Sequence, residues 1–101
     1  MAQKMSPIHP GEILSEEFLQ DLGVTQYRLA RDINVDPRRI NAIVKGQRDI
    51  SVDTALRLAR YFGTTAEFWL NAQLHYDLEV GRDELAPRIE NDVKPLENHG
   101  A

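Results

Sequence analysis

The chain has 101 residues, no cysteine and a formal net charge of −4 at pH 7. Its length supports one domain with a modest core, and the lack of cysteine excludes disulfides, thiolate metal sites and cysteine nucleophiles. No apolar run approaches the roughly 20 residues of a membrane-spanning helix, so we expect a soluble, cytoplasmic protein.

The first predicted helix follows His9 and ends near Leu22, before the stop signal Gly23. Its apolar side chains recur at helical spacing, at Ile13, Leu14, Phe18, Leu19 and Leu22. Its outer face is acidic, with Glu12, Glu16, Glu17, Gln20 and Asp21. This face is either solvated or turned toward a basic partner.

Two short helices follow, separated by a sharp turn at Asn34, a residue type that tolerates the left-handed conformation. Thr25 is the predicted N-cap of the first, which places Gln26 in an exposed first turn where its amide can reach a phosphate oxygen. Asp36 is the predicted N-cap of the second, with Pro37 at the first helical position, where a missing N–H costs nothing.

The helix from Asp36 to Lys45 turns a basic face outward. Ile40, Ile43 and Val44 point inward, and the opposite surface consists of Arg38, Arg39, Asn41, Ala42 and Lys45. A helix of about 10–12 Å diameter fits the major groove of DNA, and Arg and Asn can form paired hydrogen bonds to base edges. We therefore interpret residues 36–45 as the recognition helix of a helix-turn-helix, with a merely solvated face as the alternative.

The charge is divided unevenly along the chain. Residues 1–22 have a balance of −3, residues 23–62 carry eight basic against four acidic residues for a balance of +4, and residues 63–101 have a balance of −5. The positive charge therefore falls on the predicted helix-turn-helix and its neighbour, as expected for a protein with one phosphate-facing side.

Gly46 ends the basic helix, and the loop after it carries Arg48, a candidate for contact with the DNA backbone. Ser51 is the predicted N-cap of the next helix, which ends at Gly63. Its predicted buried face consists of Val52, Ala55, Leu56, Leu58, Ala59 and Phe62.

Thr65 caps a fifth predicted helix whose apolar residues point in too many directions for one small core. We expect a two-fold dimer that buries Phe68, Trp69, Leu70, Leu74 and Tyr76. Such a dimer would set two recognition helices about 34 Å apart on a pseudo-palindromic operator. The alternative is a helix that lies wholly within its own core.

The acidic segment 81–101 contains two prolines and is predicted to be a weakly ordered tail after a domain at residues 6–80. Its apolar residues are spaced by three or four, at Leu85, Ile89, Val93 and Leu96, so part of it could become helical against a partner.

No constellation for catalysis is visible in the sequence. His9, His75 and His99 are too dispersed for a metal site, and neither HExxH nor a phosphate-binding glycine loop is present. We expect no enzyme activity, no metal and no cofactor.

Three separated segments, HPGEIL, ISVDTALRLARYFG and EFWLNAQLHYDLE, resemble the HigA-type antidotes of bacterial toxin–antitoxin modules, a branch of the lambda-repressor-like (Xre-type) helix-turn-helix proteins. The similarity covers about residues 6–80. It implies an all-α, five-helix fold and a homodimer that binds the operator of its own operon. It also implies that the protein neutralises a HigB-like toxin, a messenger RNA endonuclease. Two alternatives remain: a repressor with no toxin, and a protein-interaction module with vestigial DNA binding.

By motif position, the resemblance implies phosphate contact by Gln26 and base contact by Pro37, Arg38 and Ala42, with Lys45 and Arg48 on the backbone. Because Pro37 and Ala42 offer only apolar contact, Arg38 and Arg39 would supply most of the hydrogen bonds to bases. A basic toxin would suit the acidic first helix or the tail.

Overall fold

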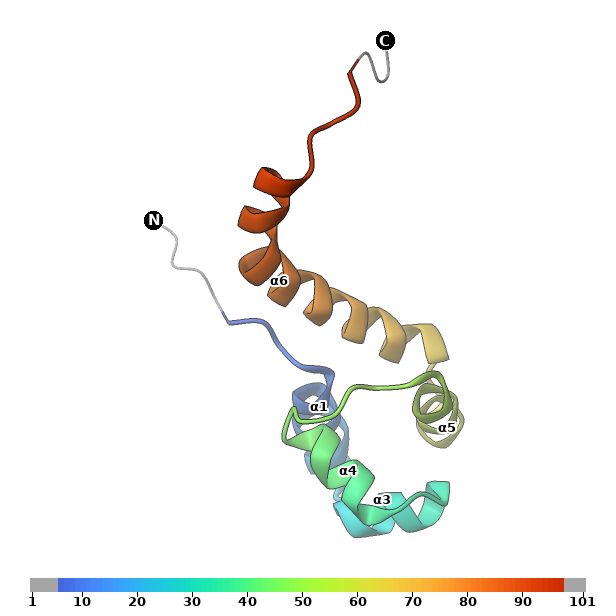
Figure 1. Ribbon diagram of the computed structural model, residues 1–101. Helices are drawn as coiled ribbons and strands as arrows, with labels where there is room; N and C mark the ends of the chain where they lie inside the picture. The colour runs from blue at the N-terminus through green and yellow to red at the C-terminus, as the bar shows by residue number, and fades with distance from the viewer. Residues whose placement is uncertain (1–5, 98–101) are drawn as a thin grey trace.

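Five helical rods make up the part of the chain that the computed structural model describes, residues 6–97 (Figure 1). The first rod is continuous and consists of α1 (Pro10–Glu12), the π-helical η1 (Ile13–Leu19) and α2 (Gln20–Leu22). The others are α3 (Gln26–Ile33), α4 (Pro37–Val44), α5 (Val52–Phe62) and α6 (Ala66–Asp92). Residues 6–97 contain no strand, which confirms the all-α, five-helix fold class.

The predicted N-caps begin their helices as expected. Side-chain oxygens of Thr25, Asp36, Ser51 and Thr65 each accept a hydrogen bond from a backbone amide two or three residues later. Each bond satisfies one of the amides that a helix start leaves without an intrahelical partner. At the turn between α3 and α4, Asn34 has the predicted left-handed conformation, with φ of 61°.

The middle of the first rod is a π-helix, which the sequence prediction missed. The amide of Gln20 donates to the carbonyl of Ser15, five residues earlier. A bond of this kind brings residues five apart to the same side of a helix. Leu14 and Leu19, at that spacing, are accordingly both buried, with exposed fractions of 0% and 5%.

Trp69 lies in the centre of the core and has no exposed surface. Its ring packs against those of Phe18 and Phe68, at centroid distances of 4.9 and 5.0 Å. Its indole N–H donates to the Thr64 hydroxyl at 2.9 Å, so its polar atom is satisfied within the same chain. This corrects the prediction that Trp69 lies in a dimer interface, because none of its surface is left for a second copy.

Several side chains predicted to be buried are exposed instead. Leu22 and Val52 are each 60% exposed, and Leu56 is 57% exposed. Leu22 is the last residue of the first rod and Val52 the first residue of α5, so each has a neighbouring helical turn on one side only. Leu56 lies on the side of α5 opposite the fully buried Leu58.

Helix α6 continues past Val80 to Asp92, where the sequence analysis had placed the tail. Leu85 and Ile89 lie in this added part of α6, in agreement with the alternative prediction that part of the tail could be helical. Figure 1 shows the C-terminal part of α6 bending upward from the rest of the helix. Pro87 lies inside α6, where it removes one helical hydrogen bond. Residues 93–97 have no helix, and 98–101 lie outside the described residues. Among residues 6–97, no helix combines the length and apolar character needed to cross a membrane.

Candidate nucleic-acid interface

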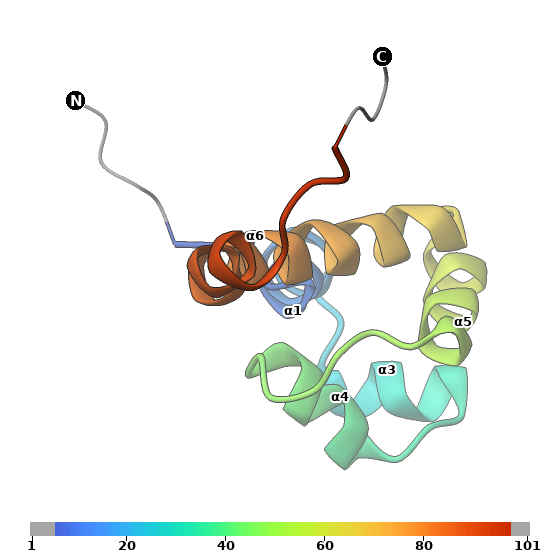
Figure 2. The same ribbon diagram turned by 45° about the horizontal axis from the view of Figure 1, so that its top comes forward.

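Helices α3 and α4 meet at the turn through Asn34 and bury one side each. Leu29, Ala30, Ile40 and Ile43 have no exposed surface. The core is therefore on the inner side of both helices, and the polar residues of α4 face away from it. Figure 2 shows α3 and α4 at the end of the molecule opposite α6, which leaves their outer side uncovered.

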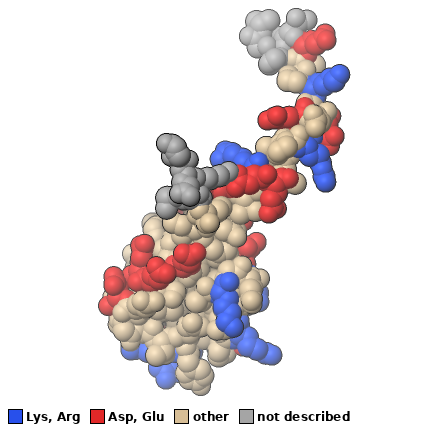
Figure 3. Space-filling view, turned by 90° about the vertical axis from the view of Figure 1, so that its left-hand side faces the viewer, with Lys and Arg blue, Asp and Glu red and all other residues tan. Residues whose placement is uncertain are grey.

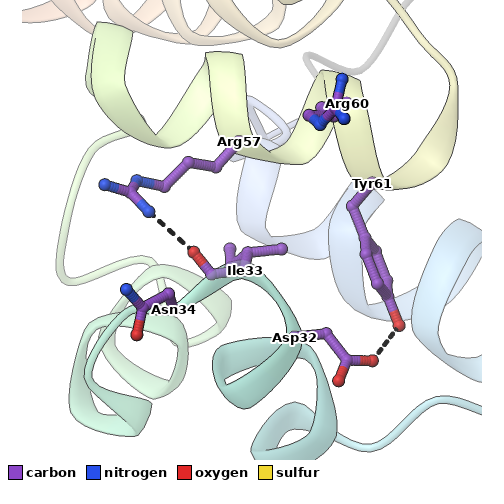
Figure 4. Close-up of a pocket in the computed structure, with 6 residues that line it drawn as sticks. All are labelled: Asp32, Ile33, Asn34, Arg57, Arg60 and Tyr61. Atoms are coloured by element: carbon purple, nitrogen blue, oxygen red, sulfur yellow. Dashed lines mark hydrogen bonds between the residues drawn. The ribbon is translucent and has the colours of Figure 1, made fainter.

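Helix α5 holds the turn between α3 and α4 in place. The Arg57 guanidinium donates to the Ile33 carbonyl at 2.8 Å, and the Tyr61 hydroxyl donates to the Asp32 carboxylate at 2.6 Å (Figure 4). The Tyr61 bond is the main reason that the pKa of Asp32 is lowered, and it raises the pKa of Tyr61. The hollow of about 390 Å³ between these groups is thus crossed by bonds that hold α5 against the last turn of α3.

The outer side of α4 presents the predicted residues. Pro37, Arg38, Asn41 and Lys45 are exposed, and Ala42 is half-buried. Arg38 is bonded to the N-cap, with its Nη2 at 2.8 Å and its Nε at 3.2 Å from the two carboxylate oxygens of Asp36. The Arg38 side chain nonetheless remains 91% exposed.

Gln26 and Asn41 form a pair that links α3 to α4. The Asn41 amide nitrogen donates to the Gln26 side-chain oxygen at 3.2 Å. Because that bond uses the oxygen of Gln26, its own amide N–H groups remain free to donate to a phosphate. Both residues were predicted to contact DNA, but the sequence does not indicate that they contact each other.

Arg39 differs from its neighbour. Its guanidinium donates to Asp53 at 2.8 Å and to the Thr54 hydroxyl at 3.4 Å, and the side chain is only 27% exposed. The Arg57 and Arg39 guanidinium groups lower the pKa of Asp53, so its carboxylate is charged at neutral pH. These bonds hold α4 against α5 and argue against the predicted contact of Arg39 with bases, which stays a prediction.

The loop after α4 exposes Arg48 and is anchored from below by Ile50, which is 3% exposed. The amide of Ile50 donates to the side-chain oxygen of Gln73 in α6 at 2.7 Å. Gln73 is itself buried, with 6% exposed, and its role was missed because an isolated Gln on an apolar helix gives no sequence signal.

His9 is a second residue whose structural role is not evident from the sequence. Its Nδ1 accepts from the amide of Gly11 at 2.9 Å, so it is the N-cap of the first rod. Its ring packs edge-on against Tyr76 of α6, at 4.8 Å between centroids. A Cβ at Gly11 would overlap the carbonyl oxygen of Ile43, which shows how closely α1 approaches the end of α4.

The remaining predicted dimer residues divide into two groups. Leu70 and Tyr76 are half-buried, Leu70 against the core and Tyr76 beside His9. Phe68 and Leu74 are 41% and 55% exposed, so they keep surface that a second chain could cover.

Acidic and basic side chains gather in different places on the body of the molecule. In the face drawn in Figure 3, basic side chains lie at its lower end and acidic ones form a patch on its left side, whereas both kinds occur together toward the C-terminus. In residues 6–97, no three His, Asp or Glu side chains are arranged to hold a metal ion, and His99 lies outside that range.

Comparisons with known proteins agree with this geometry. A family model described as helix-turn-helix matches residues 16–69. Virulence-associated protein I of Dichelobacter nodosus is 52% identical over 81 residues, which are 80% of this chain and 75% of that protein. Antitoxin HigA-1 of Vibrio cholerae is 36% identical over 93 residues, 92% of this chain and 87% of that protein.

A solved structure is similar along nearly its whole length. The Pseudomonas aeruginosa antitoxin HigA with the higBA promoter superposes with a TM-score of 0.86 at 46% identity. The match covers 89% of this chain and 98% of the antitoxin.

Proposed function

The chain belongs to the helix-turn-helix family, and from that premise we propose that it is a DNA-binding antitoxin that acts as a homodimer. In this proposal it represses its own operon by binding a pseudo-palindromic operator, and it neutralises a HigB-like messenger RNA endonuclease. Proteins of this family are regulators and not enzymes. The observation that carries the proposal is the uncovered polar side of α4, where Arg38, Asn41 and Lys45 are exposed.

That side of α4 has the shape and chemistry of a major-groove reader. The helix is narrow enough for the groove, and its exposed residues are donors to base edges and phosphates. Gln26, held by Asn41 at 3.2 Å, adds a phosphate donor from the start of α3. The Pseudomonas aeruginosa antitoxin HigA, whose structure contains the higBA promoter, supports DNA binding by this chain.

DNA binding is tested by fluorescence anisotropy with duplexes from the chain's own promoter region. Arg38→Ala is expected to cost about 1–3 kcal/mol at one base position, because it removes a base contact. Arg48→Ala is expected to weaken binding to all sequences and to reduce the salt slope by about one. Arg60→Ala, an exposed arginine on α5, is the matched control and should leave base discrimination intact. Full operator binding by Arg38→Ala would contradict the assignment of α4.

Dimerisation is supported by an apolar stripe along α6, consisting of Leu74, Leu78, Gly81, Leu85 and Ile89. Its four large side chains are 44–55% exposed, and it borders a hollow of about 330 Å³. A Cβ built at Gly81 meets nothing within 4 Å, so the backbone there is open to close approach by a second helix. A second α6 would cover the stripe and remove its apolar surface from water.

The dimer is tested by sedimentation velocity. Leu78→Glu should produce a monomer that keeps its helical content, because the side chain is 44% exposed and its loss leaves the core intact. Leu56→Glu, at 57% exposure on α5, is the matched control and should remain dimeric. A monomeric wild type at the concentration where it binds operator would argue against the proposal, as would a dimeric Leu78→Glu.

Toxin neutralisation is supported by the similarity to HigA antitoxins. The test is co-purification of the product of the neighbouring open reading frame with the tagged chain, followed by a growth-rescue assay in which both are expressed. Rescue by the wild-type chain is expected. If no neighbouring product binds and operator binding is intact, the chain is a repressor with no toxin.

A further inference from the structure

Asp36 accepts three hydrogen bonds from Arg38, one from its backbone amide and two from its guanidinium. Its Oδ1 accepts from the Arg38 amide at 2.8 Å, which is the N-cap bond of α4. The same carboxylate accepts from Nε at 3.2 Å and from Nη2 at 2.8 Å. The guanidinium side-chain bonds, followed by the amide bond, lower the pKa of Asp36 to about 2, so the pair is ionised at neutral pH.

These bonds use only one edge of the guanidinium. The Nε–Nη2 edge lies against Asp36, whereas the Nη1–Nη2 edge at the tip points away from it, and within residues 6–97 Nη1 has no hydrogen-bond partner. The tip edge carries two parallel N–H donors. Guanine presents two acceptors, O6 and N7, to such a pair, whereas adenine presents one acceptor beside a donor.

We propose that Asp36 is a positioning residue that determines specificity: by holding the Nε–Nη2 edge of Arg38, it presents the tip edge to a guanine in the operator. This inference rests on the proposed function. An arginine without such a partner is free to rotate toward phosphates, which contact it equally well at any sequence. The carboxylate also adds a negative charge beside the DNA, which weakens binding to every sequence.

Asp36 is expected to raise discrimination between bases and to lower affinity for all DNA. Because these two effects can be measured separately, the proposal is testable. Asp36→Ser keeps a good N-cap oxygen, but its side chain is too short to reach the guanidinium. We expect its affinity for unrelated DNA to hold or rise because a negative charge is lost. We expect its discrimination between guanine and adenine to fall at one position per half-site, from about tenfold to hundredfold in the wild type to a few-fold.

The experiment measures dissociation constants for the operator, for duplexes with each guanine of a half-site replaced by adenine, and for unrelated DNA. Asp36→Asn, which keeps the cap and one acceptor without charge, is expected to lie between the wild type and Asp36→Ser. In an Arg38→Ala background, Asp36→Ser should change discrimination no further. Urea unfolding of each variant establishes that α4 remains folded.

Three outcomes would overturn the inference. Unchanged discrimination in Asp36→Ser would mean that Asp36 is only a helix cap. A rise in both operator affinity and discrimination would mean that Asp36 sequesters Arg38 from the DNA. A wild type that does not distinguish its operator from unrelated DNA would remove the proposed function itself, which separates that failure from the first two.

Discussion

Gln73 is a buried amide that ties α6 to the loop after α4. Its side-chain oxygen accepts from the amide of Ile50 at 2.7 Å, and its nitrogen donates to Asp77 at 3.0 Å. Gln73→Met keeps the length of the side chain but removes the acceptor, so the buried Ile50 amide loses its partner. A buried donor without a partner costs about 1–3 kcal/mol, a large fraction of the 5–15 kcal/mol that is typical of a domain.

The loss is measured by urea unfolding, followed through the fluorescence of Trp69, the single tryptophan. With slopes of roughly 1–3 kcal/mol per molar urea, a loss of about 2 kcal/mol lowers the midpoint by about 0.7–2 M. Asn71→Met, at an exposed position of the same helix, is the control and should change stability by less than about 0.5 kcal/mol. Equal midpoints for the two variants would refute the argument, because they would mean that water replaces Gln73 at the Ile50 amide.

Three further predictions concern the recognition helix and its supports. Asp36 has a pKa of about 2 in the fold against an ordinary 3.8, so its stabilising effect is complete above about pH 4 and lost as the pH falls toward 2; Asp36→Asn should flatten that part of a plot of urea midpoint against pH. Arg39→Ala, which removes the ion pair with Asp53, should cost about 0.2–1 kcal/mol in unfolding experiments and leave base discrimination unchanged in binding assays. Gly11→Ala should lower stability by about 1–3 kcal/mol in a thermal melt, because the new methyl group pushes against the carbonyl of Ile43; an unchanged melting temperature would contradict this packing.

The helix boundaries were predictable because they depend on residues a few positions apart. Thr25, Asp36, Ser51 and Thr65 each cap a helix through a bond to an amide two or three residues later. The π-helical segment was not predictable by the same method. A stripe of apolar residues at successive spacings of one, four, one and three fits an α-helix well enough to conceal a bond that spans five residues.

The end of α6 shows a different limit. An excess of acid and two prolines indicated a tail after Val80, yet the helix runs to Asp92 because the spacing of Leu85 and Ile89 keeps the helical period. Local composition and periodicity pointed in opposite directions there. The sequence alone does not show whether composition or periodicity determines the structure there. The apolar stripe formed by the end of α6 packs against no other part of the described chain, so no core contact decides between them.

The amino-acid sequence by itself determined that this protein is a set of five helices, with N-caps at Thr25, Asp36, Ser51 and Thr65, and that the second helix of its helix-turn-helix is basic. Only the tertiary structure decided which partners and how much solvent exposure residues of similar type have when they lie close together in the sequence. Arg38 and Arg39 are adjacent and identical in type, yet one is held by Asp36 and stays 91% exposed, and the other reaches Asp53, fourteen positions along the chain, and is 27% exposed. In the same way Trp69 is core and Leu74 is surface. Such differences arise from contacts between elements that are distant in sequence, and capping and periodicity act only within a turn or two.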